Sequence, residues 1–106
     1  MRKDYPMHTI YLGSRNGKPF LPADYSKIKD IMLKEFHHFT MLEVDGVYAR
    51  EDVKTMVIKV ASDAVEKVRR IVTKLGQGMG QKGVGWETGG QYRSIMAIPP
   101  SHAVAF

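Results

Sequence analysis

The chain has no cysteine among its 106 residues. This absence excludes disulfide bonds, a thiolate nucleophile and sulfur-ligated metal sites. No apolar run approaches the roughly 20 residues of a membrane-spanning helix, and the opening Met-Arg-Lys-Asp lacks the apolar core of a signal peptide. We therefore expect a cytoplasmic protein that has no membrane partner.

Histidine is also scarce, and its spacing does not suit metal binding. His37 and His38 are adjacent, so on a helix their side chains point about 100° apart and cannot chelate one ion. His8 and His102 lie near opposite ends of the chain. We expect neither a metal nor another cofactor.

Two segments have the pattern of amphipathic helices. In the first, over residues 23–38, apolar residues recur at Tyr25, Ile28, Met32 and Phe36, after a start signal of proline and aspartate. The second, over residues 63–75, begins with an aspartate and a glutamate at capping-box spacing. Gly76 follows it, where a helix commonly ends in a left-handed glycine at the C′ position.

The remaining segments are rich in strand-forming residues. Residues 8–13 alternate apolar and polar side chains, residues 39–49 and 53–61 predict an antiparallel hairpin, and residues 82–87 predict a last strand. The order β-α-β-β-α-β is that of the ferredoxin-like α+β sandwich, an antiparallel sheet with two helices on one face. We expect one such domain over residues 1–106, with an extended C-terminal arm from about residue 92.

A nucleic-acid partner is not expected, although the net charge of +5 and the pI near 9.6 favour anionic ligands. Lysine and arginine are spread from Arg2 to Arg93 instead of forming a block. RNA-binding domains with the same element order stack bases on aromatic side chains of the strand that here covers residues 53–61. That strand, VKTMVIKVA, contains no aromatic residue.

The segment GMGQKG, residues 78–83, matches the spacing G-x-G-x-x-G of dinucleotide-binding loops. In those loops the glycines follow a strand and open a helix, whereas here they follow a helix and precede a strand. The dinucleotide interpretation is therefore rejected. Two interpretations stay open: a flexible connection after the helix cap, or a loop whose backbone approaches a ligand closely, with Lys82 adding positive charge.

Tyr48 and Glu51 lie at the predicted hairpin tip, where a phenol and a carboxylate could project into a cleft or simply be solvated. Asp45-Gly46 is a competing turn; if Tyr48 ends the strand, this pair is instead a bulge. Trp86 is the only tryptophan, and we expect it to pack in the core.

The central forty residues resemble the phage-encoded S-adenosylmethionine (SAM) lyases, also called SAM hydrolases. The similar positions are Gly46, Tyr48, Glu51, Lys54-Thr55, Arg70 and the pattern Gln81-x-x-Val84. The same pattern is similar to a family of uncharacterised small bacterial and phage proteins.

The resemblance implies a reaction that needs no protein nucleophile. The substrate's own carboxylate attacks its γ-carbon, which releases methylthioadenosine and homoserine lactone. By this resemblance Glu51, or Asp52 as the alternative, would pair with the substrate ammonium, and Tyr48 would bind the methionine tail. Gln81 would hold the tail from the next strand, and Gly80, Lys82 and Gly83 would border the nucleoside.

The resemblance also implies a homotrimer with ligands bound between subunits, in the host cytoplasm if the chain is phage-encoded. We expect the sheet face without helices to carry Met56, Ile58 and Val60, which a neighbouring subunit would cover. Two other functions stay open: a non-enzymatic binder of small nucleotides that uses the same cleft, and an interaction protein whose sheet face only makes an oligomer.

Overall fold

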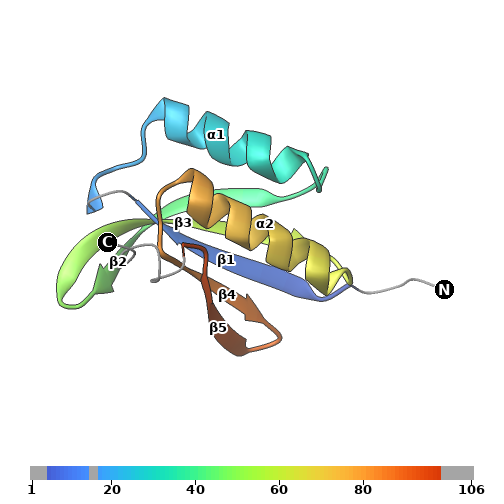
Figure 1. The fold of residues 1–106 in the computed structure, drawn as a ribbon. Coiled ribbons are helices and arrows are strands. Elements are labelled where there is room, and N and C mark those ends of the chain that lie inside the picture. The colour runs from blue at the N-terminus through green and yellow to red at the C-terminus, as the bar shows by residue number, and fades with distance from the viewer. Residues whose placement is uncertain (1–4, 15–16, 99–106) are drawn as a thin grey trace, which may run out of the picture.

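The computed structural model describes residues 5–14 and 17–98. Its elements follow in the order β1-α1-β2-β3-α2-β4-β5 (Figure 1). Their bounds are Met7–Gly13 for β1, Pro22–Leu33 for α1, Thr40–Tyr48 for β2, Glu51–Ala61 for β3, Val65–Gly78 for α2, Gly83–Thr88 for β4 and Gln91–Met96 for β5. No helix in the described ranges is long and apolar enough to cross a membrane.

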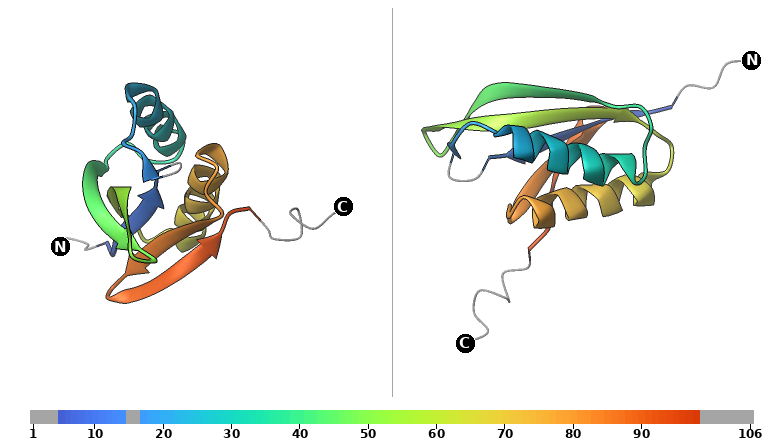
Figure 2. Two further views of the ribbon diagram at one scale, coloured as in Figure 1. Left: turned by 90° about the vertical axis from the view of Figure 1, so that its left-hand side faces the viewer. Right: turned by 90° about the horizontal axis from the view of Figure 1, so that it is seen from above.

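The strands form one antiparallel sheet in the order β2-β3-β1-β4-β5, and both helices lie side by side on the same face of it (Figure 2). The first four strands and the helices make the predicted ferredoxin-like α+β fold. β5 adds a strand at the edge beside β4, in the segment where the sequence predicts an extended arm. The rest of that arm, over residues 99–106, lies outside the described residues.

Helix α1 buries the stripe that its spacing predicts. Ile28 and Met32 are fully buried, and the carboxylate of Asp24 accepts a hydrogen bond of 2.8 Å from the backbone N–H of Leu21 at the start of the helix. The predicted end at residue 38 is too late. Beyond the helix, the N–H of Phe36 still reaches the carbonyl of Met32 at 2.9 Å, and this last turn brings the Phe36 ring into the core.

Helix α2 does not end where the sequence predicts. Gly76 lies inside the helix, and the left-handed residue is Gly80, with φ of 68°. The N–H of Gln81 donates to the carbonyl of Gly76 at 2.7 Å, and the N–H of Gly80 donates to the carbonyl of Gln77 at 3.4 Å. These two bonds define a Schellman cap, so the C′ glycine is Gly80.

The predicted capping box at the start of α2 is also wrong. The N-cap is Ala64, whose N–H donates to the hydroxyl of Ser62 at 3.0 Å. Glu66 instead bonds to Arg69 one turn further along the helix, at 3.2 Å. The start of α2 is therefore stabilised by a serine that precedes it.

Strands β2 and β3 form the predicted hairpin, and its turn is Ala49-Arg50, with φ of 51° and 68°. Two residues with positive φ are typical of a type I′ turn. The competing turn at Asp45-Gly46 is wrong, and so is the bulge, because this pair lies opposite Lys54 and Val53 in an unbroken register. The outer part of the hairpin extends beyond β1, which pairs with β3 only from Thr55 onward (Figure 1).

The face of β3 that packs against the helices is the opposite of the one predicted. Met56, Ile58 and Val60 are almost fully buried in the core, with exposed fractions of 2% or less. Val53, Thr55 and Val57 alternate with them and lie on the open face. Both rows are largely apolar, so alternation alone does not tell which row the helices cover.

Trp86 is fully buried, as predicted, and belongs to a polar network with His8. The Nε2–H of His8 donates to the carbonyl of Ser62 at 2.8 Å, because a carbonyl can only accept. His8 Nδ1 then accepts from the hydroxyl of Thr88 at 2.7 Å and from the indole N–H of Trp86 at 3.1 Å. The guanidinium of Arg93 covers the indole, 3.6 Å from its centroid. The network fixes β1, β4 and β5 to one another.

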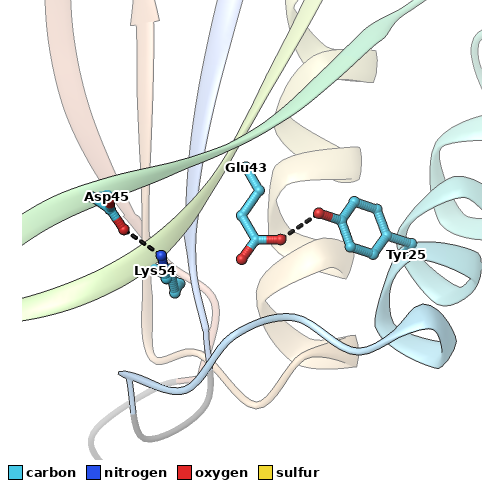
Figure 3. A network of polar contacts seen from close by, with 4 residues as sticks. All are labelled: Tyr25, Glu43, Asp45 and Lys54. Atoms are coloured by element: carbon cyan, nitrogen blue, oxygen red, sulfur yellow. Dashed lines mark hydrogen bonds and ion pairs between the residues drawn. The ribbon is translucent and has the colours of Figure 1, made fainter.

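A second polar network joins α1 to the hairpin (Figure 3). The hydroxyl of Tyr25 donates to the carboxylate of Glu43, and the ammonium of Lys54 donates to the carboxylate of Asp45. The hydrogen bond to Glu43 raises the pKa of the Tyr25 hydroxyl above its ordinary value of 10.0. The bond from Tyr25 is a direct side-chain link between α1 and β2.

We expect Tyr25→Phe to lower the free energy of unfolding by about 1 kcal/mol at neutral pH, because it removes one hydrogen bond at a half-buried position. Since the folded-state pKa is raised above 10.0, this contribution is complete below pH 10 and is lost as the pH rises through the raised pKa. Urea unfolding at pH 7 and above pH 10 checks this. A difference between the two proteins that stays constant over this range would contradict it.

Candidate functional site

A cavity of about 540 Å³ opens on the sheet face that the helices leave bare. Its lining comes from β1 and the residue after it, from β3, from the segment between α2 and β4, and from β4 and β5. The lining residues are Tyr11, Gly13, Ser14, Val53, Thr55, Gly80, Gln81, Lys82, Gly83, Gly85, Tyr92 and Ser94. This volume is within the range typical of small-molecule pockets.

The cap of α2 delivers Gln81 to this cavity. Because Gly80 turns the chain in the left-handed conformation and the Gln81 N–H is held by the carbonyl of Gly76, the backbone before β4 has a fixed course. The Gln81 carboxamide then lies over Gly13 of β1. A Cβ on Gly13 would meet the Gln81 Oε1 at 3.2 Å, so a glycine leaves room for this contact.

Two tyrosines form the aromatic wall of the cavity. Tyr11 and Tyr92 have ring centroids 6.1 Å apart at an angle of 49°. The Tyr92 phenol lies directly over Gly85, where a Cβ would be only 2.4 Å from the hydroxyl oxygen. Tyr11 donates to the carboxylate of Glu87 at 2.9 Å, and this hydrogen bond raises the pKa of Tyr11 above its ordinary value of 10.0. The Tyr92 phenol thus lies against the backbone of a glycine, and the Tyr11 phenol is held by the Glu87 carboxylate.

Ser14 lies at the end of β1, in the cavity wall. Its N–H extends the ladder to β3 by donating to the carbonyl of Lys54 at 3.0 Å. Its side chain is 9% exposed, and within the described residues its hydroxyl oxygen has no hydrogen-bond partner. Buried polar groups in folded proteins nearly always have one.

The structure brings together one part of the predicted site and leaves the other part aside. Gly80, Gln81, Lys82 and Gly83 all line the cavity. Glu51 lies outside the lining; it is exposed and pairs with Tyr48 at the end of the hairpin. Alternation along β3 puts Glu51 on the open face, two residues beyond Val53.

Asp52, the alternative to Glu51, is exposed as well and pairs with Val47. Because neighbouring residues of a strand point to opposite faces, Asp52 points away from the face that carries Glu51 and the cavity. The geometry therefore favours Glu51 as the acidic residue of a site on the open face.

Sequence reasoning missed Tyr11, Ser14 and Tyr92. Alternation over residues 8–13 could have placed Tyr11 opposite Ile10 and Leu12, on the solvent side of the sheet. The isolated glycine within VGW could have indicated a close approach over Gly85. No pattern in the sequence indicates that the hydroxyl of Ser14 is buried, since the residues that surround it come from distant segments of the chain.

Two solved structures share this architecture. One is described as a phage SAM lyase in the apo state, with a TM-score of 0.66 and 19% identity over 92% of this chain and 95% of that chain. The other is a phage SAM lyase in complex with S-methyl-5′-thioadenosine, with a TM-score of 0.67 and 17% identity over 92% and 93% of the two chains. This chain has the fold of these phage SAM lyases. The resemblance inferred from the central motifs is confirmed at that level.

No protein-family model matches the sequence, and no curated protein matches it. In the described ranges, no group of three or more histidine, aspartate and glutamate side chains is arranged to hold a metal ion.

Proposed function

We propose that this protein is a SAM lyase, which cleaves SAM into methylthioadenosine and homoserine lactone in the cytoplasm. The observation that carries the proposal is the cavity of about 540 Å³ that receives Gln81. It lies in a chain whose fold matches a phage SAM lyase bound to S-methyl-5′-thioadenosine over 92% of its length.

The chemistry suits a site without a nucleophile. An oxygen of the substrate carboxylate forms a bond to the γ-carbon while the bond from that carbon to sulfur breaks, so the carboxylate and the sulfonium neutralise each other. A site with little water favours such a transition state over the separated charges of the ground state. Lys82 is the only charged residue in the described lining, and the other polar groups there are hydroxyls and a carboxamide.

Each predicted residue has a role in this proposal. Glu51 pairs with the substrate ammonium, and Tyr48 binds the methionine tail in its folded conformation. Gln81 holds the tail from the side of β4. Gly80 and Gly83 let the backbone approach the nucleoside, and Lys82 attracts the anionic part of the ligand.

We also propose a homotrimer in which one subunit completes the site of the next. On the open sheet face the side chains of Leu42, Tyr92 and Met96 are 59%, 64% and 60% exposed. Exposed apolar surface of this kind favours association. Because Glu51 lies outside the cavity of its own chain, a neighbouring chain is well suited to supply it. Light scattering should give three times the chain mass of 12.0 kDa, and a monomer at micromolar concentration would contradict the trimer.

Incubation with SAM, followed by chromatography for methylthioadenosine and homoserine lactone, tests the activity. Because SAM also decomposes slowly without an enzyme, buffer alone and Gln81→Ala protein are the controls. Early samples in ¹⁸O-labelled water distinguish the two possible reactions: cyclisation gives a lactone without label, and direct hydrolysis gives labelled homoserine. Binding of SAM without either product would indicate the non-enzymatic nucleotide binder instead.

A further inference from the structure

The ring of Tyr92 rests on a glycine in the cavity wall. Tyr92 belongs to β5 and lies over Gly85 of the neighbouring strand β4. A Cβ on Gly85 would have its three nearest atoms in this one side chain, at 2.4, 2.8 and 2.9 Å. The tyrosine therefore occupies the place on the open face that a side chain of residue 85 would take.

The two tyrosines of the cavity differ in how firmly they are held. Tyr11 is half-buried, and its hydroxyl donates to the carboxylate of Glu87 at 2.9 Å. Tyr92 lies on the edge strand and is 64% exposed. Rotation about χ1 moves an exposed ring between staggered positions while its backbone stays in the sheet. Tyr11 is thus a fixed wall of the cavity, and Tyr92 is a movable one.

Moving Tyr92 off Gly85 opens a slot in the sheet face. The register places Gly85 between Tyr11 of β1 and Ser94 of β5. Since neighbouring strands lie about 4.8 Å apart, β1 and β5 are separated by about 10 Å across a position that has no side chain.

The two rings are already close to the separation that a flat molecule requires. Their centroids are 6.1 Å apart, and their planes are inclined by 49°. A planar ring held between two others needs about 3.5 Å on each side, or about 7 Å in all. An outward movement of Tyr92 by roughly 1 Å, together with a rotation of its ring, provides this space.

A flat aromatic ring suits such a slot, and in a nucleoside that ring is the base. Aromatic side chains attract the faces of bases by stacking. The polar groups of the lining leave this end of the cavity free, because the Gln81 carboxamide lies over Gly13, two residues further along β1 than Tyr11. A base between the tyrosines and a methionine tail at Gln81 therefore fit the cavity together.

We propose that Tyr92 is a specificity-determining residue of this cavity, which moves off Gly85 and stacks on the base of the nucleoside ligand, with Tyr11 on the other side of the base. The inference rests on the proposed function and assigns the base subsite within it.

Calorimetric titration with 5′-methylthioadenosine tests the assignment. We expect Tyr92→Leu to weaken binding at least about fivefold, the lower limit for the loss of one stacked aromatic ring. Tyr92→Phe keeps the ring and should restore the affinity. Tyr5→Leu, which changes an exposed tyrosine outside the lining, is the matched control and should bind normally. Light scattering at the same concentration checks that the variants have the same assembly state.

A fluorescent ligand distinguishes stacking from a general loss of affinity. The 2-aminopurine analogue of methylthioadenosine loses emission when its base stacks on another ring. At saturating protein, the bound analogue should be brighter in Tyr92→Leu than in unaltered protein, and equally quenched in Tyr5→Leu. A purely structural role of Tyr92 would lower the affinity and leave the emission of the bound analogue unchanged.

Gly85→Ala tests the movement of Tyr92 without changing the tyrosine. The new methyl group would take the place of the Tyr92 hydroxyl, so the ring has to turn aside even without a ligand. If the ring is movable, the melting temperature should stay nearly unchanged, while binding of methylthioadenosine weakens because the methyl group fills the floor of the slot. A large fall in melting temperature would show that the ring is fixed and would overturn the proposed movement.

The outcomes separate this inference from the proposed function. If unaltered protein binds methylthioadenosine and Tyr92→Leu binds it equally well, the assignment of Tyr92 is wrong and the proposed function stands. Weaker binding with unchanged emission of the bound analogue would also overturn the assignment, because the ring would not touch the base. If unaltered protein neither binds a nucleoside nor cleaves SAM, the proposed function fails and the inference fails with it.

Discussion

Replacing Gly76 with alanine is expected to destabilise the fold by about 3 kcal/mol, which corresponds to a fall of more than about 10 °C in melting temperature. A Cβ at this position would lie 2.3 Å from the Cβ of Ala97, 2.9 Å from Cγ2 of Val84 and 3.1 Å from the carbonyl oxygen of Gln81. None of these atoms is the free end of a long side chain. The backbone of α2 or of the segment after β5 would therefore have to move.

Gly78→Ala is the matched control, because it adds the same methyl group two residues further along the same helix. Its Cβ would meet Cδ1 of Ile31 at 2.8 Å, and the end of that flexible side chain can turn away. Alanine also has the higher helix propensity, so we expect a change within about 1 kcal/mol. Thermal unfolding of the proteins at one concentration measures both effects. Equal melting temperatures for Gly76→Ala and the unaltered protein would contradict the close packing of α2 against β4 and the segment after β5.

Gly76 also shows why part of the fold could not be read from the sequence. A glycine after an amphipathic stripe predicts a helix end, and several glycines follow residue 75 at short intervals. Gly76 meets a different requirement, the close approach of Ala97 and Val84, which are distant in the sequence. The cap falls on Gly80, and only the packed structure shows which glycine has which role.

The same limit applies to the strands. The hairpin of β2 and β3 was predictable from two β-rich segments, but its turn at Ala49-Arg50 has neither the asparagine nor the glycine that a type I′ turn prefers. The covered face of β3 was not predictable either, because Val57 and Ile58 suit a core equally well. Burial under the helices, and not local pattern, selects Ile58.

The candidate site was predictable where a local motif carries it. The Gln81-x-x-Val84 pattern led to the segment that borders the cavity. Ser14 and Tyr92 belong to the same wall only because β1 pairs with β4 and β4 pairs with β5. Pairings between distant strands leave no short motif in the sequence.

Glu51→Gln is expected to lower the affinity for SAM and the rate of lactone formation at least tenfold, if Glu51 pairs with the substrate ammonium as proposed. The substitution keeps the shape of the side chain and removes its charge, and a hydrogen bond to a charged group contributes about 1.5–3 kcal/mol. The melting temperature should stay the same, because Glu51 is exposed at the hairpin. Tyr48→Phe removes one neutral hydrogen bond under the proposal and should weaken binding by about 0.5–1.5 kcal/mol.

Asp52→Asn is the matched control for Glu51→Gln, since it removes the same charge from the adjacent position on the opposite face of β3. We expect it to bind and cleave SAM normally. A normal Glu51→Gln protein together with an impaired Asp52→Asn protein would transfer the role to Asp52. Normal behaviour of both would end the proposal that an acidic residue of the hairpin holds the substrate.

Subunit mixing tests whether Glu51 and Gln81 act in the same site from different chains. Glu51→Gln and Gln81→Ala proteins should each have little activity alone. If a site combines Glu51 of one chain with Gln81 of the next, random mixed trimers contain intact sites at about a quarter of positions, and activity should return to about that fraction of the original. If both residues came from one chain, every chain in the mixture would still lack one of them. Co-expression followed by the lactone assay would then detect no recovery of activity. That result would contradict the intersubunit site but not the trimer, which light scattering tests separately.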